Sequence, residues 1–317
     1  MHTRKLVKAG QTSHTVSLPK AWLEKNNLTR GSLVYLQEKS DHELSITPHQ
    51  RETQQSQKKE ITIPVEKKEK GQLQRELTSA YINNYSLITF IGITHSEQVK
   101  AIRSIIEEFV ALEVAEHTSS KVVVKDFLNL EEISIDQTLR RMDMIIRSML
   151  KDSLQTIEKK QVLETIEYHD ADVNKLYFLL FRLLKSALQD QQMAERFSLS
   201  NNDILSRWYL IVNLENLADC AKTISELLTH VEKEQDKQEI KKVYEELHSS
   251  YEIAMKSFFT NDKQQAEEVA KKRVPFFVQC ASYLKKNQNL QSALLVEQWK
   301  EMKTLICNVA KIVMDHE

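Results

Sequence analysis

The distribution of glycine and proline divides this chain of 317 residues into two unlike parts. The four glycines stand at positions 10, 31, 71 and 92, and the 225 residues after Gly92 contain one proline, Pro275. Glycine supplies backbone conformations with positive φ, and proline breaks helix interiors. A segment nearly free of both can stay helical wherever its apolar pattern allows. We therefore expect a turn-rich head followed by a long helical body.

The composition limits the classes of partner and compartment. Apolar residues make up 41% of the chain, enough for a sizeable core, and the net charge is -1, so any basic surface must be local. Cys220, Cys280 and Cys307 form no CxxC pair and have no zinc spacing. They indicate reduced, buried thiols and a cytoplasmic protein.

No segment has the pattern of a targeting or membrane-spanning sequence. The first residues lack the apolar core of a signal peptide. The most apolar stretch, residues 176–188, contains Arg182 and Lys185, which is typical of a buried bundle helix. We expect no membrane insertion.

The head, residues 1–48, has short apolar runs separated by turn residues. Residues 16–18, 33–36 and 44–46 indicate strands, and Pro19 at the start of residues 19–25 indicates a helix of one or two turns. So few residues with such short strands do not bury an adequate core alone. We therefore expect a homodimer that forms through the head.

Positive charge is concentrated in the head. Residues 1–30 contain six basic side chains and one acid, a net charge of +5 per chain. A dimer doubles this charge, and a compact two-fold basic surface is typical of a protein that binds duplex DNA. Charge alone leaves open the alternative of a basic hairpin domain that only dimerises, because local positive patches are common.

The order of elements in the head resembles the SpoVT/AbrB family. The resemblance is carried by residues 4–7 (RKLV), Gly10 and residues 13–22 (SHTVSLPKAW), 28–35 (LTRGSLVY) and 44–48 (LSITP). Members of that family are swapped-hairpin β-barrels, built by two chains, that bind operator DNA. The resemblance implies that double-stranded DNA is contacted by Arg4, Lys5, Lys8, Ser13 and Lys20. Lysines predominate, which favours contact with phosphates over reading of bases.

A linker and a small module follow the head. Residues 49–59 are polar and predict a linker. Residues 60–130 predict a small α/β module with strands at 61–65 and 87–91, helices at 73–85 and 96–109, and a final hairpin over 112–125. Pro64 places the first strand at an edge or at its own end. The module has no phosphate-cradling glycine loop and no nucleophile motif, so we expect a structural spacer.

The body shows six helical patterns, which predict an all-α bundle. They cover residues 134–154, 162–188, 204–228, 239–259, 260–284 and 290–314, with a charged connector at 232–238 and a kink at Pro275. Ser134 and Gln137 form a capping box for the first helix. Residues 217–222 resemble residues 306–311 at an offset of 89 residues. We expect two three-helix repeats, at 131–229 and 230–317.

The body resembles the PhoU family. The resemblance is carried by residues 134–142 (SIDQTLRRM), 169–182 (HDADVNKLYFLLFR), 215–219 (ENLAD) and 271–277 (KKRVPFF). It implies a six-helix bundle of two three-helix repeats. The fusion of an AbrB-like head with a PhoU bundle resembles archaeal phosphate-uptake regulators, which makes the expected fold multidomain.

Some PhoU proteins hold metal ions on E/D-x-x-x-D motifs, because carboxylates one turn apart can share a hard cation. Glu215 and Asp219 match this motif in full, whereas Asp170 is followed by Asn174. Thr304 and Asn308 take the equivalent positions of the second repeat. We therefore consider a divalent metal or iron at Asp170, Glu215 and Asp219, with His169 as a substitute ligand. The alternative is that Glu215 and Asp219 form salt bridges with Arg182, Lys175 or Lys222.

Three functional hypotheses follow. The first is a DNA-binding transcriptional regulator of phosphate uptake and phosphate homeostasis, whose body receives a signal or a partner. The second is an adaptor without affinity for DNA that binds a phosphate transporter's ATPase or a signalling kinase. The third, a metalloenzyme, needs Glu-x-x-His motifs that the chain lacks, since His169 follows Glu167 at the wrong spacing. We expect that the protein is not an enzyme.

Overall fold

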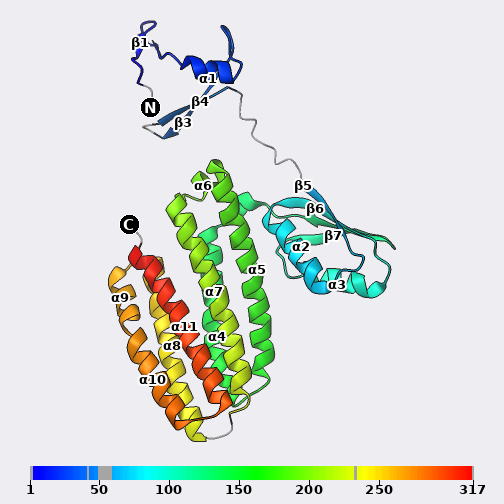
Figure 1. Ribbon diagram of the computed structural model, residues 1–317, viewed down its shortest axis with the longest axis vertical. Helices are drawn as coiled ribbons and strands as arrows, with labels where there is room; N and C mark the ends of the chain where they lie inside the picture. Colours follow the sequence, from blue (N-terminus) through cyan, green and yellow to red (C-terminus); the bar gives the residue numbers. More distant parts are fainter. Residues whose placement is uncertain (1–2, 41–42, 49–58, 232–233, 316–317) are drawn as a thin grey trace. The chain divides into compact units, whose positions relative to one another are not determined.

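The computed structural model describes residues 3–40, 43–48, 59–231 and 234–315. The chain separates into two compact units, Met1–Gln57 and Lys58–Glu317 (Figure 1). The predicted linker, residues 49–59, lies outside the described residues except for Lys59, which begins the first strand of the second unit.

The described residues of the first unit, the head, form two hairpins and one short helix. Strands β1 (Val7–Lys8) and β2 (His14–Thr15) pair antiparallel, as do β3 (Tyr35–Ser40) and β4 (Glu43–Thr47). Helix α1 (Lys20–Lys25) begins directly after Pro19, as its sequence predicts. The strand expected at 16–18 lies earlier in the chain, at β2, because His14 and Thr15 pair with β1 and residues 16–18 do not. The strand expected at 33–36 begins later and runs further, because its partner is β4.

The described residues of the head form no buried core. Among its residues whose side chains the structure describes, none is buried. The two sheets stay separate, and the described part of the chain forms no closed barrel. The predicted swapped-hairpin barrel requires a second copy of the head, and it remains a prediction.

The second unit begins with the expected α/β module. Its strands are β5 (Lys59–Pro64), β6 (Tyr85–Ile91), β7 (Leu112–His117) and β8 (Lys121–Asp126), in the sheet order β5-β6-β8-β7. Strand β5 runs parallel to β6, and the other pairs are antiparallel. Pro64 ends an edge strand, where its missing N–H costs no ladder bond, as predicted. Helices α2 (Lys70–Ile82) and α3 (Ser96–Ile106) pack against each other beside this sheet (Figure 1).

The rest of the second unit is a bundle of long helices. They are α4 (Ile135–Ser153), α5 (Val162–Gln189), α6 (Gln191–Arg196), α7 (Asn201–Leu228), α8 (Glu234–Thr260), α9 (Lys263–Lys271), α10 (Arg273–Lys286) and α11 (Leu290–Asp315). The Ser134 hydroxyl accepts a hydrogen bond from the Gln137 amide, as the capping signature predicts. Helix α8 begins within the connector expected at 232–238, whose charged residues are good helix formers.

Two short features refine the expected six helices. The fifth helix is broken at Lys272 into α9 and α10, because Pro275 has no N–H to donate to the preceding turn. Helix α6 was not predicted, although Asp190 caps it by accepting a hydrogen bond from the Gln192 amide. The long helices then fall into two groups in chain order. The first group is α4, α5 and α7. The second group is α8, the broken helix formed by α9 and α10, and α11.

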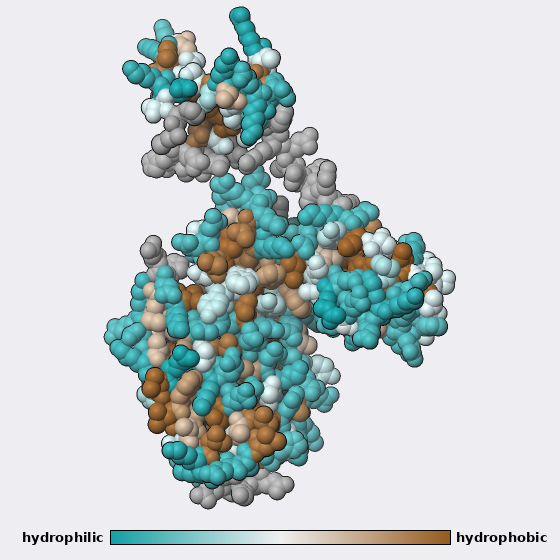
Figure 2. Space-filling model, in the orientation of Figure 1, coloured by the Kyte–Doolittle hydropathy of each residue, from teal (hydrophilic) through white to brown (hydrophobic). Residues whose placement is uncertain are grey.

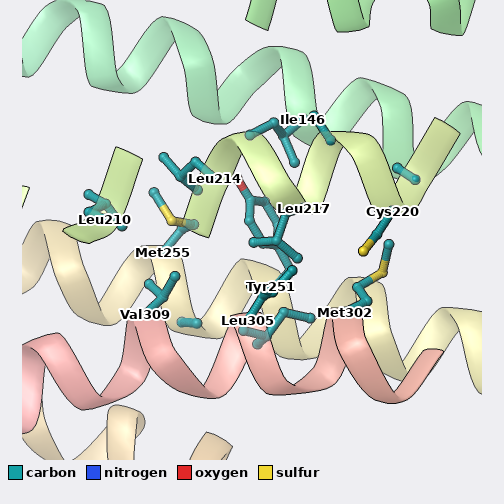
Figure 3. Close-up of a cluster of buried hydrophobic side chains, with 14 of the residues drawn as sticks. Ile146, Leu210, Leu214, Leu217, Cys220, Tyr251, Met255, Met302, Leu305 and Val309 are labelled. Atoms are coloured by element: carbon teal, nitrogen blue, oxygen red, sulfur yellow. The ribbon is translucent and has the colours of Figure 1, made fainter. Parts of the chain in front are cut away.

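The two groups share one apolar core. Figure 3 shows side chains from α4, α7, α8 and α11 meeting between the helices, among them Ile146, Leu214, Tyr251 and Met302. Helices α7 and α11 are joined by two polar contacts, from Asn308 Nδ2 to Asn213 Oδ1 at 3.0 Å and from Gln291 Nε2 to the Leu227 carbonyl at 2.8 Å. No described helix is long and apolar enough to cross a membrane.

A buried arginine on α5 fastens the α/β module to the bundle. Arg182 is only 3% exposed; its guanidinium donates Nη2–H to Asp126 and Nε–H to Asn84 Oδ1 at 2.6 Å, and it lies 4.6 Å from the Tyr81 ring centroid. Asn84 also donates to Ser186 on α5 at 2.8 Å. These contacts correct one expectation, because Arg182 pairs with the module and not with Glu215 or Asp219.

Candidate functional sites

The predicted DNA-contacting residues of the head are all exposed. Arg4 and Lys5 lie on the segment that leads into β1, and Lys8 ends that strand opposite His14. Lys20 is the first residue of α1, and its ammonium lies 3.6 Å from the Glu24 carboxylate, with both side chains well exposed. An exposed pair of this kind contributes little to stability.

The β1–β2 turn brings Lys8 and Ser13 together. The Ala9 amide donates to the Ser13 carbonyl at 3.0 Å, which closes the turn between the two strands. A Cβ at Gly10 would lie 2.9 Å from the Ser13 hydroxyl oxygen, so the turn favours glycine at this position. A lysine and a hydroxyl on a tight exposed turn can both donate hydrogen bonds to phosphate oxygens.

Large apolar side chains are exposed beside these basic residues. Leu6 is 72% exposed and Leu33 is 75% exposed, and the set also includes Val7, Val16, Leu36 and Leu44. Figure 2 shows hydrophobic and hydrophilic side chains mixed on the visible face of the head. Within a unit that has no buried residue of its own among those described, this apolar surface is available for a second chain.

The carboxylates suggested as metal ligands lie together where α5 meets α7. Asp170 is buried, Glu215 is half-buried, and Asp219 lies one turn further along α7. Loss of surrounding water raises the pKa of Glu215 to about 7, and the negative charges of Asp219 and Asp170 add to the shift. Partial desolvation, followed by repulsion from Asp170, raises the pKa of Asp219 as well. Three acids in mutual electrostatic contact can attract a cation.

Lys222 occupies the place of that cation. Its Nζ donates to Asp170 Oδ2 at 2.9 Å, and this hydrogen bond is the main cause of the raised pKa of Lys222. The sequence offered Lys222 as a partner of Glu215 or Asp219, whereas the structure pairs it with Asp170. Tyr177 was not anticipated here, yet its pKa is raised by burial and then by the Glu215 charge.

Carboxylate oxygens suit a hard divalent cation, and Asp170 Oδ1 is buried without a hydrogen-bond partner. Yet nowhere in the described ranges do three His, Cys, Asp or Glu side chains stand close enough to hold one ion. The Nδ1 atom of His169, the suggested substitute ligand, is also buried without a partner. As placed, these residues form an internal ion pair with Lys222, so a metal ion would bind here only by displacing that lysine.

Comparison with known proteins bears on the bundle. Residues 139–228 match the family model of the PhoU domain. The match runs from α4 to the end of α7, which is the first group of helices. The fold is also similar to the crystal structure of PhoU from Pseudomonas aeruginosa, with a TM-score of 0.50 and 14% identity over 57% of this chain and 93% of that chain. No curated protein matches the sequence.

These findings support the PhoU resemblance over residues 139–228, and the structural similarity shows a PhoU-like helical fold. The head and the α/β module lie outside the PhoU match. The second group of helices, α8 to α11, also lies outside it.

Proposed function

We propose that the protein is a cytoplasmic, DNA-binding transcriptional regulator of phosphate homeostasis that dimerises through its head. The observation that carries the proposal is that the head exposes basic and large apolar side chains together and has no core among its described residues. A second copy of the head would cover the apolar residues and double the positive charge. The PhoU-like bundle would receive the signal and change the fit of the paired heads to a two-fold operator.

Salt-dependent DNA binding by the full chain tests this proposal. We expect binding to duplex DNA that weakens steeply with salt, with a slope of roughly −0.9 for each phosphate contact. Replacing Lys5, Lys8 and Lys20 by glutamine removes six cations from a dimer. The dependence of DNA binding on salt should then be less steep, with a slope smaller in magnitude by about 5. The matched control replaces Lys159, Lys160 and Lys285 by glutamine, three lysines that are exposed in the bundle. Equal DNA binding by the two variants, or none by the wild type at low salt, would end the proposal.

The oligomeric state tests the dimer separately. We expect the full chain to sediment as a dimer, and Leu6→Asp with Leu36→Asp to shift it toward the monomer by placing charge on the apolar surface. DNA affinity should fall in parallel, because each head then carries half of the combined charge. A wild type that stays monomeric at micromolar concentration would contradict the dimer.

The PhoU-like bundle favours a second candidate, an adaptor that binds a component of a phosphate transporter or a signalling kinase. On this alternative the head only dimerises. The variant with glutamine in place of Lys5, Lys8 and Lys20 distinguishes the two functions. If this variant still captures the partner and regulates phosphate fully, the result supports the adaptor.

We also propose that a divalent metal or iron competes with Lys222 for Asp170, Glu215 and Asp219. Titration of the full chain with Mn²⁺ should then show weak binding that is strengthened in Lys222→Met and lost in Glu215→Gln. Identical affinity in wild type and Lys222→Met would rule out the competition.

A further inference from the structure

Four cationic side chains gather in the second group of helices, where α9 breaks into α10 beside α11. They are Lys272, Arg273, Lys300 and Lys303. The Arg273 guanidinium carbon lies 5.3 Å from the Phe277 ring centroid, and the Lys300 ammonium lies 5.9 Å from the same centroid. The charge of Lys272 lowers the pKa of Lys303, and the charges of Lys303 and Arg273 both act on the Cys307 thiol, so the four cations lie in one neighbourhood.

These cations lack acidic partners. Among the residues that the structure describes, no carboxylate lies within ion-pair distance of any of the four. Glu246 is the acid that acts on Lys303 from a greater distance. Like charges repel one another, so an anion that joins the cluster relieves this repulsion.

One of the four cations, Lys303, lies inside the bundle. Lys303 is fully buried; its Nζ donates to Ser250 Oγ at 2.8 Å and lies 5.4 Å from the Phe276 ring centroid. Burial lowers the pKa of Lys303. A fully buried lysine without a carboxylate is expensive to maintain by packing alone.

Arg273 has an unused donor. Its Nη2 reaches Thr304 Oγ1 at 3.4 Å, a long contact, and its Nε–H is buried without a hydrogen-bond partner. The Thr304 hydroxyl is itself fixed, because it donates to the Lys300 carbonyl at 2.8 Å. A buried guanidinium donor beside a half-buried ammonium can serve a ligand that supplies several acceptor oxygens.

The two groups of helices therefore carry opposite charge at equivalent positions. Thr304 and Asn308 on α11 correspond to Glu215 and Asp219 on α7, at the offset of 89 residues noted in the sequence. The first group surrounds its position with carboxylates, whereas the second surrounds it with lysine and arginine. Positive charge around this position disfavours a metal ion and suits a ligand of negative charge.

We propose that Arg273 and Lys300, supported by Lys272 and the buried Lys303, form a binding site for a small tetrahedral oxyanion such as phosphate or sulfate. The guanidinium fork matches an oxyanion with two parallel donors, and charge-assisted hydrogen bonds of this kind are the strong ones. Neither Arg273 nor Lys300 offers an acceptor, so the site distinguishes anions from cations by charge and by donor count. The site lies in the bundle and does not depend on DNA binding by the head.

Calorimetric titration of the full chain with inorganic phosphate, and separately with sulfate, at constant ionic strength tests the proposal. We expect one anion per chain. Arg273→Gln and Lys300→Gln should each weaken binding about tenfold or more, since each removes a charge-assisted donor. The control is Lys285→Gln, an exposed lysine on the same helix α10, and it should bind as the wild type does.

Circular dichroism establishes that each variant keeps its helices, and Lys300→Gln alone decides the question if Arg273→Gln does not fold. Two results overturn the site: equal affinity in Lys300→Gln and Lys285→Gln, or no binding of either anion to the wild type. Phosphate binding without sulfate binding also contradicts it, because a site made of donors alone accepts both. The variant without Lys5, Lys8 and Lys20 should bind phosphate as the wild type does, so this outcome is separable from the fate of the DNA-binding proposal.

Discussion

Replacing Arg182 by methionine should uncouple the α/β module from the bundle. Arg182 and Asp126 form a buried ion pair, with the two side chains 3% and 6% exposed. The change keeps an unbranched apolar stem and removes the charged guanidinium, so the Asp126 carboxylate stays buried without its cation. It also removes the donor to Asn84 and the cation above the Tyr81 ring.

The expected cost is large. Removing one partner of a buried ion pair costs about 3–5 kcal/mol, because the remaining charge is uncompensated. Lys185→Met is the matched control. Lys185 makes one hydrogen bond from the same helix to the module, 2.8 Å from Asn83 Oδ1, and is half-buried. Its loss should cost about 1 kcal/mol.

Urea unfolding of the full chain, followed by circular dichroism, measures both variants, and hydrogen exchange in β8 and β6 reports on the module. Adding Asp126→Asn to Arg182→Met should recover much of the loss. The second change removes the unpaired buried charge at position 126. It keeps the side-chain oxygen that accepts a hydrogen bond from the Leu128 amide at 3.0 Å. The reasoning is refuted if Arg182→Met costs less than Lys185→Met, or if the second change adds a further loss.

Three other predictions concern the bundle. In metal-free buffer the wild type should lose stability as the pH rises from about 5 to 7. The folded-state pKa of Glu215 is about 7, above its ordinary value, so the carboxyl group favours folding only while it is protonated. At pH 8, Glu215→Gln should be more stable by about 1–2 kcal/mol after allowance for solvent screening, and equal pH profiles would contradict this. Burial raises the pKa of Cys220 to about 12 and that of Cys280 to about 11, and Cys307 is buried as well. The three thiols should therefore resist a thiol reagent at pH 8 until urea unfolds the protein. Trp299→Ala should cost about 3–5 kcal/mol in urea unfolding, because Trp299 is fully buried against Tyr283.

Local signals in the sequence predicted much of the fold. The helices of the bundle follow from apolar residues at helical spacing. The break at Lys272, ahead of Pro275, and the strand end at Pro64 follow from the missing proline N–H. These features depend on neighbouring residues in the chain. Helix α6 was missed because six residues are too few to show a period, although Asp190 is a good cap.

The head was predicted less well. Its strand boundaries differ from the expectation because strand pairing, and not apolar alternation, decides where β1 to β4 begin and end. The exposure of Arg4, Lys5, Lys8, Ser13 and Lys20 agrees with a DNA-contacting role, but their convergence on one face requires a second copy, which a single chain does not show.

The sequence by itself determined the helical body, the turn-rich basic head and the carboxylate motif on α7, because periodicity, capping and charge are properties of nearby residues. Only the tertiary structure decided which charges meet. Arg182 pairs with Asp126 across 56 positions, and Lys222 pairs with Asp170 across 52 positions. Similarly, Arg273 reaches Thr304 across 31 positions. Such pairs depend on how helices pack and on which side chains lose water, and neither is set by spacing along the chain.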